Sequence, residues 1–169
     1  PDLEITRRVQ ELLKLRQASC SVYADEIPKE EWKRILLREG DRTDAILVLG
    51  GDGTMLRAAR DTADSQIPML GINLGTLGYL TEVEKNGMED AIDRLVAGSY
   101  QVEDRMMLCG QIYRQGRMEE ENSALNDITI TRCGHLRMLY FQIYVNGKLL
   151  KEYHADGIII ATPTGSTGY

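Results

Sequence analysis

The residues best suited to do chemistry form the run 50–54, with the sequence Gly-Gly-Asp-Gly-Thr, directly after the apolar stretch 45–49. Three glycines tolerate positive φ angles and let another molecule approach closely, so the turn presents one carboxylate at its tip. Thr54 is placed to cap a helix through residue 59, which would aim free N–H groups at the turn. Because a carboxylate repels a phosphate that it merely cradles, Asp52 is expected to handle a proton or a magnesium ion. The run therefore predicts phosphoryl chemistry.

Two further groups of polar residues lie in the second half of the chain. Asn126 and Asp127 form one, and Asp156 precedes an apolar strand, 158–161, that leads into the loop 162–169. This loop is rich in hydroxyl groups and ends on a tyrosine. Such side chains hydrogen-bond ribose, adenine or phosphate, and a tyrosine can stack on a base. Each group alone is better explained as a solvated loop, whereas their occurrence together favours a nucleotide site.

Apolar periodicity predicts an α/β arrangement for the first half of the chain. Helices are expected over 2–15 with Asp2 as the cap, from Pro28 to Gly40, and over 54–59 and 88–96. Short strands are expected over 20–24, 45–49 and 68–73. This alternation predicts a Rossmann-like open parallel sheet, whose ligands bind beyond the carboxyl ends of the strands. Asp52 and a second glycine-rich run, 71–80, both fall there, although that run also suits a plain connecting loop.

The pattern changes after Gly98 to the period of two that is typical of strands. Residues 139–145 alternate between apolar and polar, and Asn146-Gly147 predicts a hairpin turn into a returning strand, 149–153. A second hairpin is expected from 108–114 across 115–116, with further strands over 127–131 and 158–161. We therefore expect an α/β domain over residues 1–100 and an all-β domain, a β-sandwich, over 101–169.

Composition restricts the classes of protein to which the chain can belong. The 169 residues are 43% hydrophobic, as in a globular protein with a core, and no apolar run is long enough to span a membrane. The net charge of −6 argues against broad non-specific binding of nucleic acid. Cys20, Cys109 and Cys133 are odd in number and widely spaced, which indicates a reduced, cytoplasmic setting. The chain begins at Pro1 and stops at Tyr169 inside a motif, so we expect an incomplete fragment that is marginal or inactive alone.

The order of the motifs resembles that of the NAD kinase family over nearly the whole chain. The family pattern is a Gly-Gly-Asp-Gly-Thr turn, an Asn-x-Gly-x-Leu-Gly-aromatic loop, an Asn-Glu pair and an Asp-Gly strand ending in Thr-Pro-Thr-Gly-Ser-Thr-Ala-Tyr. The matching segments here are 50–54, 73–79, 126–127 and 156–169. The departures from the family pattern are Thr76 for histidine, Tyr79 for phenylalanine, Asp127 for glutamate and Gly168 for alanine.

This resemblance implies transfer of the terminal phosphate of ATP, or of inorganic polyphosphate, to the 2′-hydroxyl of the adenosine ribose of NAD, giving NADP. A divalent cation, expected to be magnesium, would be required. The resemblance also implies an N-terminal α/β domain, a β-sandwich domain that is incomplete in this chain, and assembly as a homodimer or homotetramer. Nucleic acid and membrane are not expected partners.

The resemblance also implies roles for individual residues. Asp52 would be the general base or the acid that organises the metal, and no dedicated metal ligands are assigned. The residues near the donor phosphates would be Gly51, Gly53 and Thr54. The dinucleotide would be bound by Asn73, Tyr79, Asn126, Asp127, Asp156, Thr164, Thr167, Gly168 and Tyr169. Within that set Asn126 and Asp127 would hold ribose and adenine, and Asp156 would lie near the nicotinamide, often across a subunit contact.

Two other functions stay open from the residues. The Gly-Gly-Asp-Gly turn also occurs in sugar and lipid kinases, and a chain with these loops could bind a dinucleotide without catalysis. His135 and His154 are poor catalytic candidates because neither has a metal-ligand partner at useful spacing. His154 shares a strand face with Asp156 and could border the same pocket, although it is not assigned a site role.

Overall fold

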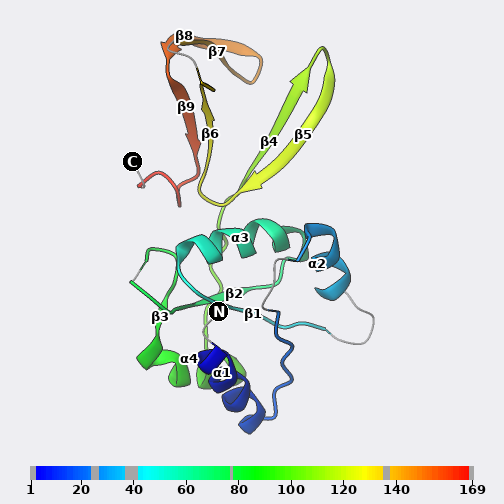
Figure 1. Cartoon of the computed structure of the whole chain (residues 1–169), viewed down its shortest axis with the longest axis vertical. Helices are drawn as coiled ribbons and strands as arrows, with labels where there is room; N and C mark the ends of the chain where they lie inside the picture. Colours follow the sequence, from blue (N-terminus) through cyan, green and yellow to red (C-terminus); the bar gives the residue numbers. More distant parts are fainter. Residues whose placement is uncertain (1–2, 24–26, 37–41, 77, 135–137, 168–169) are drawn as a thin grey trace. The chain divides into compact units, whose positions relative to one another are not determined.

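The computed structural model describes residues 3–23, 27–36, 42–76, 78–134 and 138–167 (Figure 1). The chain divides into two compact units, Pro1–Asp104 and Arg105–Tyr169, which are described separately below. None of the described helices is long and apolar enough to cross a membrane. The expected cap Asp2 and the expected helix end Gly40 lie outside the described residues.

The first unit is an α/β unit built around a parallel sheet. Its elements are α1 (Leu3–Leu15), α2 (Lys29–Leu36), β1 (Ile46–Leu49), α3 (Asp52–Thr62), the 3₁₀ helix η1 (Ala63–Ser65), β2 (Met69–Asn73), β3 (Val83–Glu84), the 3₁₀ helix η2 (Lys85–Gly87) and α4 (Met88–Val96). The strand order is β1-β2-β3, and both pairings are parallel. The expected α/β class and parallel sheet are confirmed.

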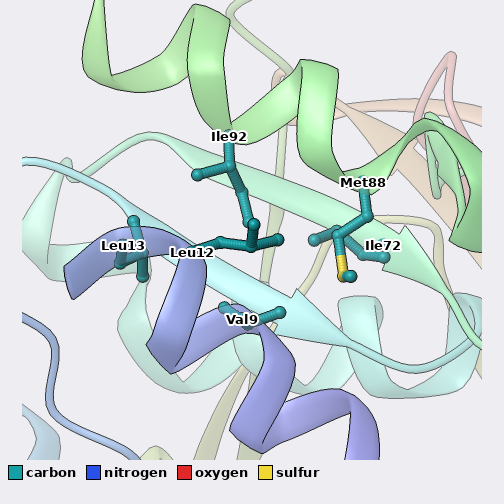
Figure 2. Packing of buried hydrophobic residues seen from close by; sticks show 6 residues of the cluster. All are labelled: Val9, Leu12, Leu13, Ile72, Met88 and Ile92. Carbon is teal, nitrogen blue, oxygen red and sulfur yellow. The ribbon is translucent and has the colours of Figure 1, made fainter. Parts of the chain in front are cut away.

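Helices lie on both sides of this sheet, as an apolar parallel sheet requires. α1 and α4 lie on one side, and α3 lies on the other (Figure 1). Figure 2 shows the buried side chains where α1 and α4 pack against β2, which are Val9, Leu12, Leu13, Ile72, Met88 and Ile92. Each buried aliphatic side chain of this kind contributes roughly 1.5–3 kcal/mol through removal from water. The apolar stripes read from the sequence of α1 and α4 therefore form the core under β2.

Charged side chains connect α1 to α4 at the edge of this core. Arg8 lies 3.3 Å from Glu89, and Arg16 pairs with Asp93 and lies 3.7 Å from Glu89. A side-chain hydrogen bond from the Arg16 guanidinium holds the pKa of Asp93 below its usual value. The carboxylates of Glu89 and Asp93 are more than half exposed, so these pairs add little to the stability that the apolar core gives the two helices.

The second unit consists of antiparallel strand pairs, in agreement with the expected all-β class. Two pairs are hairpins, β4 (Leu108–Arg114) with β5 (Arg117–Ala124) and β7 (Leu139–Val145) with β8 (Lys148–Ala155). The third pair, β6 (Asp127–Thr131) with β9 (Gly157–Ala161), is not local and encloses the β7–β8 hairpin in sequence.

Both hairpin turns have the backbone conformation that the sequence predicts. Asn146 and Gly147 have φ angles of 51° and 76°, and Gln115 and Gly116 have φ angles of 51° and 77°. Positive φ at both central residues matches the twist of the flanking strands, so short loops of this kind join them directly. The hairpins expected at 115–116 and 146–147 are confirmed.

Burial is much sparser in the second unit than in the first. Leu125 is the buried aliphatic side chain among its described residues, and Thr162 is a buried polar one. One close contact joins two strand pairs, because a Cβ on Gly110 would lie 2.7 Å from Cδ1 of Ile128. Backbone ladders and a few fixed contacts, rather than a large apolar core, therefore hold the described part of this unit.

Three expectations about the first unit need correction. Residues 20–23, the described part of the strand expected over 20–24, form no regular structure because β1, β2 and β3 do not pair with them. Helix α3 begins at Asp52, two residues before the expected start. The two-residue strand β3 was not expected, since a segment that short has no readable periodicity.

Candidate functional site

The carboxylate of Asp52 binds the backbone of the second glycine-rich run. Its Oδ2 accepts a hydrogen bond from the Tyr79 N–H at 2.8 Å, and its Oδ1 accepts one from the Leu80 N–H at 3.0 Å. Gly50 N–H also donates to Ile72 O at 3.0 Å, immediately beside the turn. The runs 50–54 and 71–80, which the sequence presented as separate loops, thus form one structure with the acid between them.

Gly78 makes this contact possible, and it was not among the expected site residues. A Cβ built on Gly78 would lie 2.1 Å from Oδ1 of Asp52, a distance that real Cβ atoms essentially never reach. The available signal was its place in the Asn-x-Gly-x-Leu-Gly-aromatic pattern, directly before Tyr79. That pattern shows a glycine but not the neighbour that requires it.

Thr54 has a different role from the expected cap. The N-cap of α3 is Gly51, and no side chain caps the helix. The N–H groups of Thr54 and Met55 donate to Gly51 O at 3.0 and 3.1 Å. Thr54 already lies inside the helix, and a Cβ on Gly50 would meet its Oγ1 at 2.5 Å, so its side chain covers Gly50.

The mouth of the turn has open space around its other glycines. A Cβ on Gly51 or on Gly53 would meet nothing within 4 Å. The first N–H groups of a helix have no carbonyl four residues earlier to accept them, so a helix start attracts anions. Gly51 and Gly53 therefore leave access to the start of α3 beside the Asp52 carboxylate.

Asn73 and Tyr79 differ sharply in their exposure to solvent. Asn73 ends β2, is 3% exposed, and its Oδ1 accepts the Gly75 N–H at 3.0 Å. This bond turns the chain out of the strand, so Asn73 shapes the loop. The side chain of Tyr79 is 66% exposed, although its N–H is bound to Asp52. Its ring is thus available to a ligand.

A second constellation forms in the other unit, around the backbone of Asn126. Its carbonyl oxygen accepts the Thr162 N–H at 2.8 Å and the Thr162 hydroxyl at 3.0 Å. That hydroxyl also lies 2.6 Å from Leu125 O, and it accepts the Gly165 N–H at 3.2 Å. Thr162 is only 1% exposed. Sequence reasoning missed this residue because a buried anchoring threonine looks like any other hydroxyl in a solvated loop.

Gly165 brings the loop close to Asn126. A Cβ at this position would lie 2.3 Å from Asn126 O. Thr164 is half-buried, with its hydroxyl 3.5 Å from Nη1 of Arg105, and Thr167 is exposed. The structure therefore brings Asn126 together with the described part of the hydroxyl-rich loop. The expected site residues Gly168 and Tyr169 lie outside the described residues.

Asp127 and Asp156 lie at opposite ends of the β6–β9 pair. Asp127 pairs with Ala161 next to the loop, and its Oδ1 accepts the hydroxyl of Thr129 at 3.1 Å. Asp156 precedes β9 and forms an ion pair with Arg132 at 3.1 Å. A five-residue strand spans roughly 16 Å, so Asp156 is not brought together with Asn126.

His154 lies near Asp156 in sequence but contacts another residue. Its ring lies 5.1 Å from the ring of Tyr140 across the β7–β8 ladder. Tyr140 in turn bonds Glu152, which raises the pKa of Tyr140, and the same hydrogen bond lowers the pKa of Glu152. That His154 borders a pocket with Asp156 stays a prediction.

The arrangement around Asp52 can accept a cation together with a nucleotide. In the described part of the chain no three His, Cys, Asp or Glu side chains form a group that could hold a metal ion. Mg²⁺ commonly uses one or two carboxylates and takes its other ligands from substrate phosphates and water. A single carboxylate beside an open helix start fits a cation of that kind.

Comparison with known proteins assigns the family. The family model for the ATP-NAD kinase N-terminal domain matches residues 1–100, and that for the ATP-NAD kinase C-terminal domain matches residues 125–169. An NAD kinase of Agathobacter rectalis is 58% identical over 127 residues, which cover 75% of this chain and 44% of the relative. An NAD kinase of Lachnospira eligens is 38% identical over 178 residues, which cover 100% of this chain and 59% of the relative.

A solved structure agrees with these matches. Yeast NADH kinase complexed with NADH aligns with a TM-score of 0.69 at 30% identity, covering 76% of this chain and 38% of that protein. The chain thus spans about half the length of the curated relatives it matches. A model match over more than half of the chain, together with the clasped Gly-Gly-Asp-Gly-Thr turn, shows that the chain belongs to the NAD kinase family.

Proposed function

We propose that this chain carries the phosphotransfer machinery of an NAD kinase. It transfers the terminal phosphate of ATP to the 2′-hydroxyl of the adenosine ribose of NAD and so forms NADP. The observation that carries this proposal is the Asp52 carboxylate, held by two N–H groups at the mouth of a glycine turn. Membership of the NAD kinase family supplies the identity of the two substrates.

In this mechanism Asp52 faces the acceptor hydroxyl. A carboxylate has about four lone-pair sites, and the N–H groups of Tyr79 and Leu80 use two of them. The remaining sites accept the hydrogen bond, and finally the proton, of the 2′-hydroxyl. Phosphoryl transfer passes through a loose transition state, so positioning and electrostatics contribute more than early proton removal.

The donor phosphates lie at the start of α3 in this proposal. The open positions at Gly51 and Gly53 give the anion access to the start of α3, where the N–H groups before Thr54 face it. Thr54 closes the turn over Gly50 and keeps its shape. A divalent cation, magnesium by expectation, neutralises charge on the donor phosphates when it is bound. Asp52 is the carboxylate of this turn that could help to hold it.

The second unit binds the dinucleotide in this proposal. Asn126 and Asp127, with the hydroxyl-rich loop, bind the adenosine end, and the described candidates in that loop are Thr164 and Thr167. Gly168 and Tyr169 complete this set by their place in the family motif. In the first unit Asn73 shapes the glycine loop and Tyr79 offers its ring to the dinucleotide, and in the second unit Asp156 binds the nicotinamide end. Supporting observations are the Thr162 anchor on Asn126 and the exposed ring of Tyr79.

The organisation of the whole protein is part of the same proposal. The α/β domain comprises residues 1–100 and the β-sandwich domain begins at 101. The enzyme is cytoplasmic and assembles as a homodimer or homotetramer. The curated relatives described above are NAD kinases, so a sugar or lipid kinase is not favoured.

The test is a phosphotransfer assay with ATP and NAD on the gene product that carries this sequence, with added magnesium. Asp52→Asn should lower kcat about 100-fold or more, in the range for removal of a general base, while NAD affinity changes less than threefold. Asp64→Asn, an exposed acid in η1, is the matched control and should retain activity.

Three outcomes would contradict the proposal. Undiminished turnover by Asp52→Asn would exclude the role given to its carboxylate. Phosphorylation of fructose 6-phosphate or of a lipid in preference to NAD would favour the sugar or lipid kinase. Binding of NADP without ATP-dependent turnover at any cation concentration would favour a non-catalytic dinucleotide-binding module.

A further inference from the structure

The Asp52 carboxylate fills a space that exists only because residue 78 has no side chain. A Cβ on Gly78 would lie 2.1 Å from Oδ1, 2.4 Å from Cγ and 2.7 Å from Oδ2 of Asp52. All three nearest atoms belong to the same carboxylate. The next two residues along the chain, Tyr79 and Leu80, donate the N–H groups that hold it.

This requirement is for space rather than for backbone conformation. Gly98, Gly116, Gly134 and Gly147 have positive φ angles, whereas the φ of Gly78 does not fall in that region. An alanine at 78 therefore avoids the positive-φ strain of those glycines, and the three atoms nearest to its Cβ all belong to Asp52. Gly75, in the same loop, would meet nothing within 4 Å, so small size is not needed at every glycine of the run.

We propose that Gly78 is the positioning residue for the Asp52 carboxylate. Its missing side chain lets the carboxylate approach the backbone of residues 78–80, where two hydrogen bonds fix the direction of the remaining lone pairs. Those lone pairs face the acceptor in the proposed phosphotransfer, and the catalytic part of this inference rests on that proposed function. The contact itself does not depend on it.

The expected effect of Gly78→Ala follows from the geometry. An ordinary contact begins near 3.4 Å, so the carboxylate would have to move about 1.3 Å from its 2.1 Å position. A displacement of about 1 Å at a reacting group reduces rate roughly 100-fold. The variant should therefore lower kcat by about that factor and leave KM for NAD within threefold, because the dinucleotide-binding residues are unchanged.

A thermal-stability cycle tests the contact without any activity. Gly78→Ala should lower Tm by about 5 °C or more, as overpacking does in a small domain. In an Asp52→Ala background the methyl group has space, so the same substitution should lower Tm by no more than about 1 °C. Gly87→Ala is the control, since its Cβ would lie 3.7 Å from Cγ1 of Val83 in ordinary contact.

Each outcome has a definite meaning. An equal loss of Tm from Gly78→Ala in both backgrounds would overturn the proposal, because Asp52 would not be the atom group that residue 78 must avoid. A kcat within threefold of wild type for Gly78→Ala would overturn its catalytic part. If the wild-type protein shows no phosphotransfer, the proposed function fails, while the Tm cycle still decides whether Gly78 positions Asp52.

Discussion

Replacing Thr162 by valine should loosen the attachment of the hydroxyl-rich loop to Asn126. Valine has nearly the same shape as threonine but neither donates nor accepts a hydrogen bond. The change would leave the Leu125 carbonyl and the Gly165 N–H, both in buried residues, without their Thr162 hydroxyl partner. An unsatisfied buried polar group costs about 1–3 kcal/mol, so the two groups together should cost about 2 kcal/mol or more.

Amide hydrogen exchange measures this loss at the site itself. A loss of about 2 kcal/mol or more corresponds to exchange of the Gly165 amide that is at least roughly 30-fold faster. Tryptophan fluorescence would not report it, because the single tryptophan, Trp32, lies in the other unit.

Thr162→Ser is the matched control, because it keeps the hydroxyl and removes only one buried methyl group. It should cost about 1 kcal/mol. Equal Gly165 exchange rates in the valine and serine variants would refute the reasoning, since the hydrogen bonds would then contribute nothing beyond packing. Slower exchange in the valine variant than in wild type would refute it still more directly.

Two further predictions concern the helix pair and a hairpin turn. The hydrogen bond from Arg16 lowers the pKa of Asp93, so its stabilisation is present above the usual carboxyl pKa and is lost as pH falls through the lowered value. Asp93→Asn should thus lower Tm near neutral pH and converge with wild type in acid, and a constant difference at every pH would contradict this. Gly147→Ala forces a side chain onto a φ of 76° and should cost about 1–2 kcal/mol in urea unfolding. Gly87 has a φ of −90°, so Gly87→Ala should cost clearly less.

The parallel sheet was predictable because its strands leave a direct trace in the sequence. β1 and β2 are short apolar runs, each followed by a glycine-rich segment, and such runs favour strands buried on both faces. The hairpins were predictable for a local reason as well, since Asn146-Gly147 accepts positive φ at both positions. Strands and turns that depend on residues close together in the chain could therefore be predicted from the sequence pattern.

The contacts that define the candidate site were not predictable, because they connect distant residues. Asp52 is 27 residues before Tyr79, and Thr162 is 36 residues after Asn126. Nothing in the spacing of a glycine loop shows which carboxylate it receives. Thr54 was misread for a related reason: a threonine near a helix start usually caps it, but an extended Gly51 already occupies the N-cap position here.

The β7–β8 hairpin lies in sequence between the paired strands β6 and β9, and this affects the order of folding. Between Thr131 and its partner Gly157 lie residues 132–156, a loop of 25 residues that must close before β6 and β9 pair. Pairing of β7 with β8 takes up most of this loop, from Leu139 to Ala155. The free-energy cost of closing a loop rises with the logarithm of its length, so β6 and β9 then pair at a lower cost.

We therefore expect the Asn146-Gly147 turn to control how fast the loop 162–167 forms its hydrogen bonds with Asn126. A fast local hairpin brings the distant strands together, and only then do Thr162 and Gly165 reach the carbonyl of Asn126. We thus expect a tight turn between two strands to set the rate at which the loop 162–167 attaches to Asn126.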